Sequence, residues 1–399
     1  MRAHPPKGVI RESKRVAFTC KTVPVFLLFL YASLGVGCSS VFPKFTQGES
    51  RTRPKQDLIR HIIDPKTFIG RFHPPVERSM PLIVGETLYV GSVHNRFFAL
   101  KRKNGELQWE KKIPGGVEGT PIYYDQKIYV GANNGKFYCL EAESGKEIWS
   151  YDAKVEILST PTVKGDIVFF TTANNGIYAL KANTGAWVWY FNKGYIQKIS
   201  VRGTSSPIYK DGKIYAGFSD GYFYAFNAFD GKVMWFKKLS KNEKFGDIDL
   251  APIIQKDQII VASFDGYIYA LNPITGDEKW HLLVSQAGIT GMTADEEKIY
   301  VTLFQGGVWA TQHSNGKKVW EKAISGFSTF SPVLVEDQLI FTTSGNQVRS
   351  IAAESGAEIW YTPIQTGISS KPVLFKDKLY LFSNFSALHI LDPFYFLYD

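Results

Sequence analysis

The segment NNGIYALKANTGAWVW, residues 174–189, contains the pattern that decides the fold. It starts with an Asn-Gly turn and continues into a short strand with an aromatic-small-leucine pattern, Tyr178-Ala179-Leu180. A second turn then ends at Gly185, and the strand that follows carries Trp189. Glycine supplies the positive φ that tight hairpin turns require. The segment therefore predicts antiparallel strands joined by short turns.

This pattern recurs along the chain, with its tryptophan at positions 109, 149, 189, 235, 280, 320 and 360. Most units open with a small residue and a proline, as in Thr160-Pro161, and each contains four short β-rich runs. Four antiparallel strands that repeat every forty-odd residues are typical of β-propeller blades. We interpret the tryptophans as packing between blades, and not as an array that stacks a ligand. The seven Gly-x-x-x-Trp pairs are Gly105/Trp109, Gly145/Trp149, Gly185/Trp189, Gly231/Trp235, Gly276/Trp280, Gly316/Trp320 and Gly356/Trp360.

An eighth unit is incomplete, because only three strands follow Trp360, near residues 373–375, 378–381 and 388–391. In the short repeats the tryptophan precedes the next proline by a constant interval of twelve positions, as from Trp109 to Pro121. The same interval counted back from Pro81 gives Ile69. We therefore expect residues 66–72 to complete the last blade, which removes an exposed sheet edge. The alternative is that residues 394–398 supply the strand, leaving seven blades and an appendage. The predicted fold is all-β: an eight-bladed propeller over 63–399, closed by an N-terminal strand.

The N-terminus has the features of an export signal. Six basic residues precede the apolar run 23–36, which is short for a membrane span, and Gly37 then precedes Cys38. Residues 34–38, LGVGC, are similar to a bacterial lipobox, in which the cysteine is lipidated and becomes the new N-terminus. We expect a lipoprotein signal peptide over 1–37 and a flexible tether over 38–62, rich in Ser, Thr, Pro and Lys. An ordinary secretory signal with an incidental cysteine is the alternative.

Charge and cysteine content exclude several other classes. The net charge of +9 arises from residues 1–78, because residues 79–399 hold 32 basic and 32 acidic residues. The high isoelectric point therefore does not indicate nucleic-acid binding. The three cysteines, at 20, 38 and 139, provide no disulfide framework, and the seven histidines show no ligand spacing. We expect no metal and no cofactor.

Two successive connections between blades are longer than the rest. Trp189 precedes Pro207 by eighteen positions and Trp235 precedes Pro252 by seventeen, against twelve in the short repeats. Both join an outer strand to the next inner strand, so we expect them side by side on one face. The first offers Ile199, Val201 and Arg202; the second offers Asp247 and Asp249, which project to one side if the segment is extended. An apolar and charged surface of this kind suits a protein partner. Alternatively, Arg202 pairs with Asp247 or Asp249 and only ties the two connections together.

The repeats resemble those of pyrroloquinoline-quinone-type propellers. The segments Ser200 to Pro207 (SVRGTSSP) and Asp247 to Pro252 (DIDLAP) more specifically resemble the BamB family of lipoproteins, from the outer-membrane barrel-assembly machinery. The resemblance implies that Ile199, Val201, Arg202, Asp247 and Asp249 contact a POTRA domain of BamA. It also implies a non-enzymatic scaffold that aids insertion of β-barrel proteins, lipid-anchored through Cys38 at the periplasmic face of the outer membrane. Unfolded outer-membrane proteins are further potential partners, and Ser39 after the cysteine agrees with outer-membrane sorting.

Two other functions are compatible with the repeat. Quinoprotein dehydrogenases share it, but they are longer and have large insertions, a calcium site and often a vicinal disulfide, none of which this sequence indicates. A propeller that binds an unrelated periplasmic partner, or a cell-wall ligand in its central funnel, is the second alternative.

Overall fold

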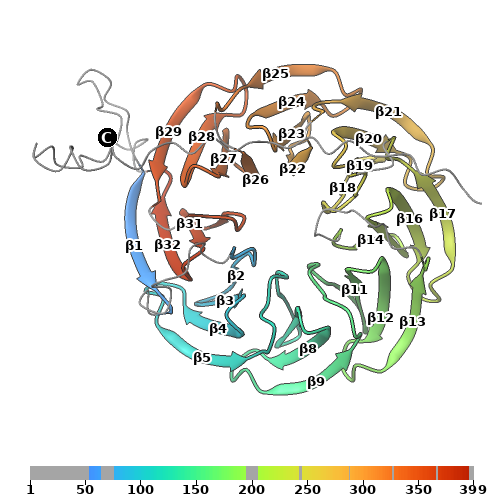
Figure 1. Cartoon of the computed structure of the whole chain (residues 1–399), viewed down its shortest axis with the longest axis vertical. Helices are drawn as coiled ribbons and strands as arrows, with labels where there is room; N and C mark the ends of the chain where they lie inside the picture. The colour runs from blue at the N-terminus through green and yellow to red at the C-terminus, as the bar shows by residue number, and fades with distance from the viewer. Residues whose placement is uncertain are drawn as a thin grey trace, which may run out of the picture. The chain divides into compact units, whose positions relative to one another are not determined.

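The structure is a computed structural model, and it describes residues 54–63, 76–194, 205–241, 245–286, 288–325, 328–364 and 367–394. The described chain forms eight four-stranded antiparallel sheets arranged as blades in a ring (Figure 1). Within each of blades 1 to 7 the strand nearest the centre comes first in the sequence and the outermost strand comes last. The all-β, eight-bladed propeller is therefore confirmed, and the alternative with seven blades is wrong.

Blades 1 to 7 each use four consecutive strands, β2–β5, β6–β9, β10–β13, β14–β17, β18–β21, β22–β25 and β26–β29. The strands are β2 Leu82–Val84, β3 Thr87–Ser92, β4 Arg96–Lys101, β5 Leu107–Lys112, β6 Ile122–Tyr124, β7 Lys127–Gly131, β8 Lys136–Glu141, β9 Glu147–Asp152, β10 Thr162–Lys164, β11 Ile167–Thr172, β12 Gly176–Lys181, β13 Trp187–Asn192, β14 Ile208–Lys210, β15 Lys213–Gly217, β16 Tyr222–Asn227, β17 Val233–Lys238, β18 Ile253–Gln255, β19 Gln258–Ala262, β20 Tyr267–Leu271, β21 Glu278–Leu283, β22 Ile289–Ala294, β23 Lys298–Leu303, β24 Val308–Gln312, β25 Lys318–Lys322, β26 Thr329–Val335, β27 Gln338–Thr343, β28 Gln347–Ala352 and β29 Glu358–Pro363.

The Gly-x-x-x-Trp motif joins neighbouring blades. Trp149 of blade 2 lies against Gly185 of blade 3, where φ is 70° and an added Cβ would lie 2.6 Å from the indole. The Trp149 Nε1 atom donates a 3.0 Å hydrogen bond to the carbonyl oxygen of Ala182, in the same turn of blade 3. Corresponding indole-to-carbonyl bonds link Trp109, Trp189, Trp235 and Trp320 to the following blade. The tryptophans therefore pack between blades, as the sequence predicts.

The eighth blade contains β30 Val373–Phe375, β31 Lys378–Phe382, β32 Ala387–Asp392 and, outermost, β1 Lys55–His61. β1 is antiparallel to β32, with Lys55 opposite Asp392 and His61 opposite Ala387. Lys378 Nζ lies 2.8 Å from both Asp57 and Asp392. The two ends of the propeller thus meet in one sheet.

The residues expected to close the ring were misplaced. Residues 55–61, assigned to the tether, form the outer strand, whereas the predicted segment 66–72 lies outside the described residues. Leu58 lies opposite Ile390, the position that a tryptophan occupies in other blades. Leu58 precedes Pro81 by nearly twice the number of positions that separate tryptophan and proline in the short repeats. Counting back by that interval failed because this connection is longer than those of the short repeats.

Candidate partner-binding face

One face of the ring carries the connections from each outer strand to the next inner strand, together with the turns between the second and third strands. We call it the connection face. The two long connections lie side by side there, since Ser205 Oγ donates a 3.1 Å hydrogen bond to the carbonyl oxygen of Leu250. Their expected proximity is therefore confirmed for the parts that the structure describes.

The second long connection enters blade 5 through Asp247 and Ile248, both fully buried. Ile248 packs on Gly217 of blade 4, and its amide donates to the carbonyl oxygen of Phe218. The carbonyl oxygen of Asp247 accepts a 2.8 Å hydrogen bond from the amide of Phe264. These contacts fix the connection between two blades, so the side chain of Asp247 lies inside the protein and not on its surface. Phe245, two residues earlier, is exposed and has a φ of 58°.

Asp249, two residues after the buried Asp247, is half-buried. Burial, followed by repulsion from Asp247, raises the pKa of its carboxyl to about 7, although hydrogen bonds from the amides of Asp249 and Leu250 oppose this shift. Arg78, which precedes the first blade, is close enough to lower that pKa slightly. Charged groups from more than one blade therefore influence the pKa of Asp249.

The predicted residues of the first long connection, Ile199, Val201 and Arg202, lie outside the described residues. The structure thus locates Asp247 and Asp249 but does not test their pairing with Arg202.

Sequence reasoning missed a buried carboxyl at the entry to blade 1. Glu77 stands four residues before Pro81, where blades 2, 3 and 5 have Val117, Ile157 and Ile248. Its oxygens accept hydrogen bonds from Ser92 Oγ at 2.7 Å, Ser386 Oγ at 2.6 Å and the Val93 amide at 3.0 Å. Burial nevertheless raises its pKa to about 7. Aligning the repeats on their prolines could have revealed this replacement of an apolar residue.

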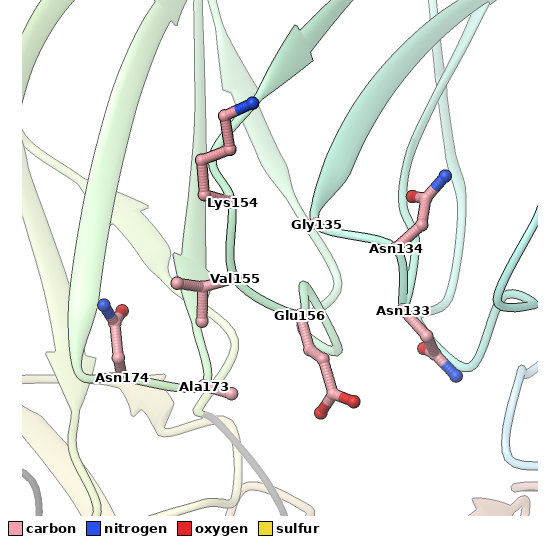
Figure 2. Close-up of a pocket in the computed structure, with 8 residues that line it drawn as sticks. All are labelled: Asn133, Asn134, Gly135, Lys154, Val155, Glu156, Ala173 and Asn174. Atoms are coloured by element: carbon pink, nitrogen blue, oxygen red, sulfur yellow. The ribbon is translucent and has the colours of Figure 1, made fainter.

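Polar groups next to Glu77 form a small network on the same face. Arg78 Nη1 lies 3.1 Å from Glu118 Oε2, and Asn133 Nδ2 donates to Glu118 Oε1 at 2.8 Å. Asn133 also borders a pocket of about 430 Å³ between blades 2 and 3 (Figure 2). The pocket is lined by Asn133, Asn134, Gly135, Lys154, Val155, Glu156, Ala173 and Asn174. Its lining thus combines three asparagines, one cation and one anion with the apolar Val155 and Ala173.

Within the described ranges, no cluster of three or more His, Cys, Asp and Glu side chains could hold a metal ion. The same residues include no helix with the length and apolar character to cross a membrane. Cys139 is a buried free thiol.

These observations define an eight-bladed propeller of the pyrroloquinoline-quinone repeat type with two long connections on one face. The sequence matches the family described as outer membrane protein assembly factor BamB over residues 66–135, 123–322 and 264–393. The chain therefore belongs to the BamB family. Comparison with curated proteins gives no match.

Solved structures show the same fold at low sequence identity. BamB from Moraxella catarrhalis is 18% identical with a TM-score of 0.73, covering 85% of this chain and 99% of its own. The computationally designed Ika8 protein is 13% identical with a TM-score of 0.68, covering 80% and 97%. Quinohemoprotein alcohol dehydrogenase from Comamonas testosteroni is 12% identical with a TM-score of 0.66, covering 80% and 74%. The fold thus occurs in proteins of different function, and the site must decide between them.

Proposed function

We propose that this protein is a non-enzymatic scaffold of the outer-membrane barrel-assembly complex. It is anchored through a lipid on Cys38 at the periplasmic face of the outer membrane, and it aids the insertion of β-barrel proteins. Membership of the BamB family is the observation that carries the proposal. The likeness to BamB from Moraxella catarrhalis over nearly the whole of that protein agrees with it.

The partner in this proposal is a POTRA domain of BamA, which binds the two long connections on the connection face. Ile199 and Val201 supply apolar contact, and Arg202 supplies the cation. Because Asp247 is buried and Asp249 half-buried, we assign the acidic pair to the base of this surface, where it sets the charge next to the connections. The exposed Phe245 adds an apolar side chain at its edge.

Co-purification from detergent-solubilised membranes tests this assignment. Arg202→Glu should abolish recovery of BamA, because it reverses the charge that the proposal assigns to the contact. Circular dichroism and the denaturation midpoint should stay unchanged, because the substitution lies in a connection between blades. Lys103→Glu is the matched control, since Lys103 is exposed in a hairpin at the opposite end of the strands. Undiminished recovery of BamA with Arg202→Glu would refute the assignment.

The structural neighbours raise one other function, that of a quinoprotein dehydrogenase. The scaffold proposal predicts no absorbance change and no dye-linked alcohol oxidation after addition of pyrroloquinoline quinone and Ca²⁺ to the purified chain. Robust turnover in that assay would overturn it.

A further inference from the structure

The outer strand of blade 3, β13, differs from the other seven outer strands in one respect. Its sequence, WVWYFN, has no charged residue, whereas each of the others has at least one. Their sequences are KQDLIRH for β1, LQWEKK for β5, EIWSYD for β9, VMWFKK for β17, EKWHLL for β21, KVWEK for β25 and EIWYTP for β29. Charged residues and prolines are the usual protection of a sheet edge against pairing with another chain. β13 has neither.

Large apolar side chains are exposed on this unprotected strand. Trp187 is 61% exposed and Tyr190 is 41% exposed, although Trp189 between them is buried against blade 4. The neighbouring outer strand β17 also exposes Met234 and Phe236. Both strands lie on the outside of the ring (Figure 1). Exposed apolar side chains therefore lie on the rim of blade 3 and on the rim of blade 4.

The free edge of β13 determines which kind of partner fits. In the order β10-β11-β12-β13 the strand is last, so among the described residues its backbone pairs with β12 alone. An extended strand can satisfy the main-chain groups of such an edge, which a lipid surface or a helix cannot do. The absence of charge and the exposed aromatic rings favour a strand whose side chains are apolar or aromatic.

We propose that β13 receives an extended, uncharged strand of another polypeptide by antiparallel or parallel strand addition. This inference rests on the proposed function in one respect: in a barrel-assembly scaffold, the strand would come from an unfolded β-barrel protein. The residues assigned to this site lie in β13, whereas those assigned to BamA lie in the two long connections, the first of which follows β13 directly in the sequence.

The probe is a fluorescent ten-residue peptide in which Val and Tyr alternate with Thr, titrated against the full-length chain in detergent. Trp187→Lys combined with Tyr190→Lys should weaken binding about tenfold, because it removes two cross-strand side-chain pairs. Trp187→Lys alone should weaken it less, and it provides a second test if the double variant does not fold. Leu107→Lys on β5 is the matched control, because Leu107 lies opposite the third-strand leucine of its blade, as Trp187 does in blade 3.

Backbone pairing is tested separately with the same peptide carrying N-methyl groups on alternate residues. We expect this peptide to lose binding, since N-methylation removes donors without changing the side chains. Equal binding of both peptides would overturn strand addition, as would undiminished binding to the lysine variants. The lysine variants could also bind the peptide normally but lose binding to vesicles, which would overturn the proposal in favour of a membrane surface. If they bound the peptide normally but lost self-association, the result would favour a second copy of the chain.

The two proposals fail in different ways. The β13 variants should still co-purify with BamA, and Arg202→Glu should still bind the peptide. If BamA is never recovered but the peptide results hold, the strand-binding edge stands and the barrel-assembly function does not.

Discussion

Gly185 shows how one residue links two blades. It needs a positive φ for the hairpin, and its missing Cβ also leaves room for the indole of Trp149. The repeated motif thus combines a turn requirement with a packing requirement. The spacing of the glycines and tryptophans could be read from the sequence. The contact, however, joins six of the seven glycines to the tryptophan of the preceding repeat and not to their own, whereas Gly105 lies against Arg60 and Leu388.

Gly185→Ala should therefore destabilise the fold more than alanine at a glycine with free space. Gly165 has a φ of 60° and no atom within 4 Å of an added Cβ, so Gly165→Ala should cost only about 1 kcal/mol of left-handed strain. Gly185→Ala should cost about 1–3 kcal/mol more, because the indole must move. Urea denaturation measures the stability of both variants. Equal midpoints would show that the packing of Trp149 does not depend on this glycine.

Glu77 predicts a pH dependence of stability. Its pKa is about 7 in the folded chain, against an ordinary value of 4.5, so the folded state binds the proton more tightly. The contribution to stability is complete below pH 4.5 and is lost as the pH rises through 7, by about 3 kcal/mol at most. Asp249 acts in the same direction, because its pKa is raised too.

Glu77→Gln should flatten the fall in the free energy of unfolding between pH 5 and pH 8, leaving the part due to Asp249. The amide keeps the size of the side chain and cannot ionise. Glu143→Gln, at an exposed position in a hairpin, is the matched control and should follow the parent chain. If the free energy of unfolding of Glu77→Gln fell with pH as steeply as that of the parent chain, ionisation of the Glu77 carboxyl would have little effect on stability.

At the scale of elements, β1 shows where sequence reasoning ended. The repeats predicted that an outer strand was missing, but the position of its replacement depended on assuming a connection of constant length. β1 has no tryptophan and no glycine motif, so nothing in KQDLIRH marks it as the eighth outer strand. Likewise, the burial of Asp247 follows from the packing of Ile248 on Gly217, which its local sequence does not reveal.

Removing β1 should open the ring. A chain that begins at Pro54 keeps the strand and should unfold at the same temperature as the full-length protein. A chain that begins at Ile62 loses the β1–β32 ladder and exposes the edge of β32, so it should unfold earlier and self-associate. Thermal unfolding and light scattering compare the two, and identical behaviour would show that β1 contributes nothing to closure.

At the scale of the whole molecule, three regions of the ring have different roles. The connection face carries the long connections, the rim of blades 3 and 4 carries the apolar edge, and blade 8 joins the two ends of the propeller. The sequence predicted the first and third of these through departures from the repeat. It did not indicate the second, because the exposure of Trp187 and Tyr190 depends on how the side chains of this outer strand pack against the neighbouring blades.

The pairing of β1 with β32 has a mechanical consequence. If Cys38 carries the lipid, the chain from the membrane reaches the folded body at Lys55, the first residue of β1. Tension on the lipid would then act first on the ladder from Lys55–Asp392 to His61–Ala387 and on the Lys378–Asp57 ion pair. With a lipid on Cys38, the seam that closes the ring would thus also be the joint that carries tension from the membrane.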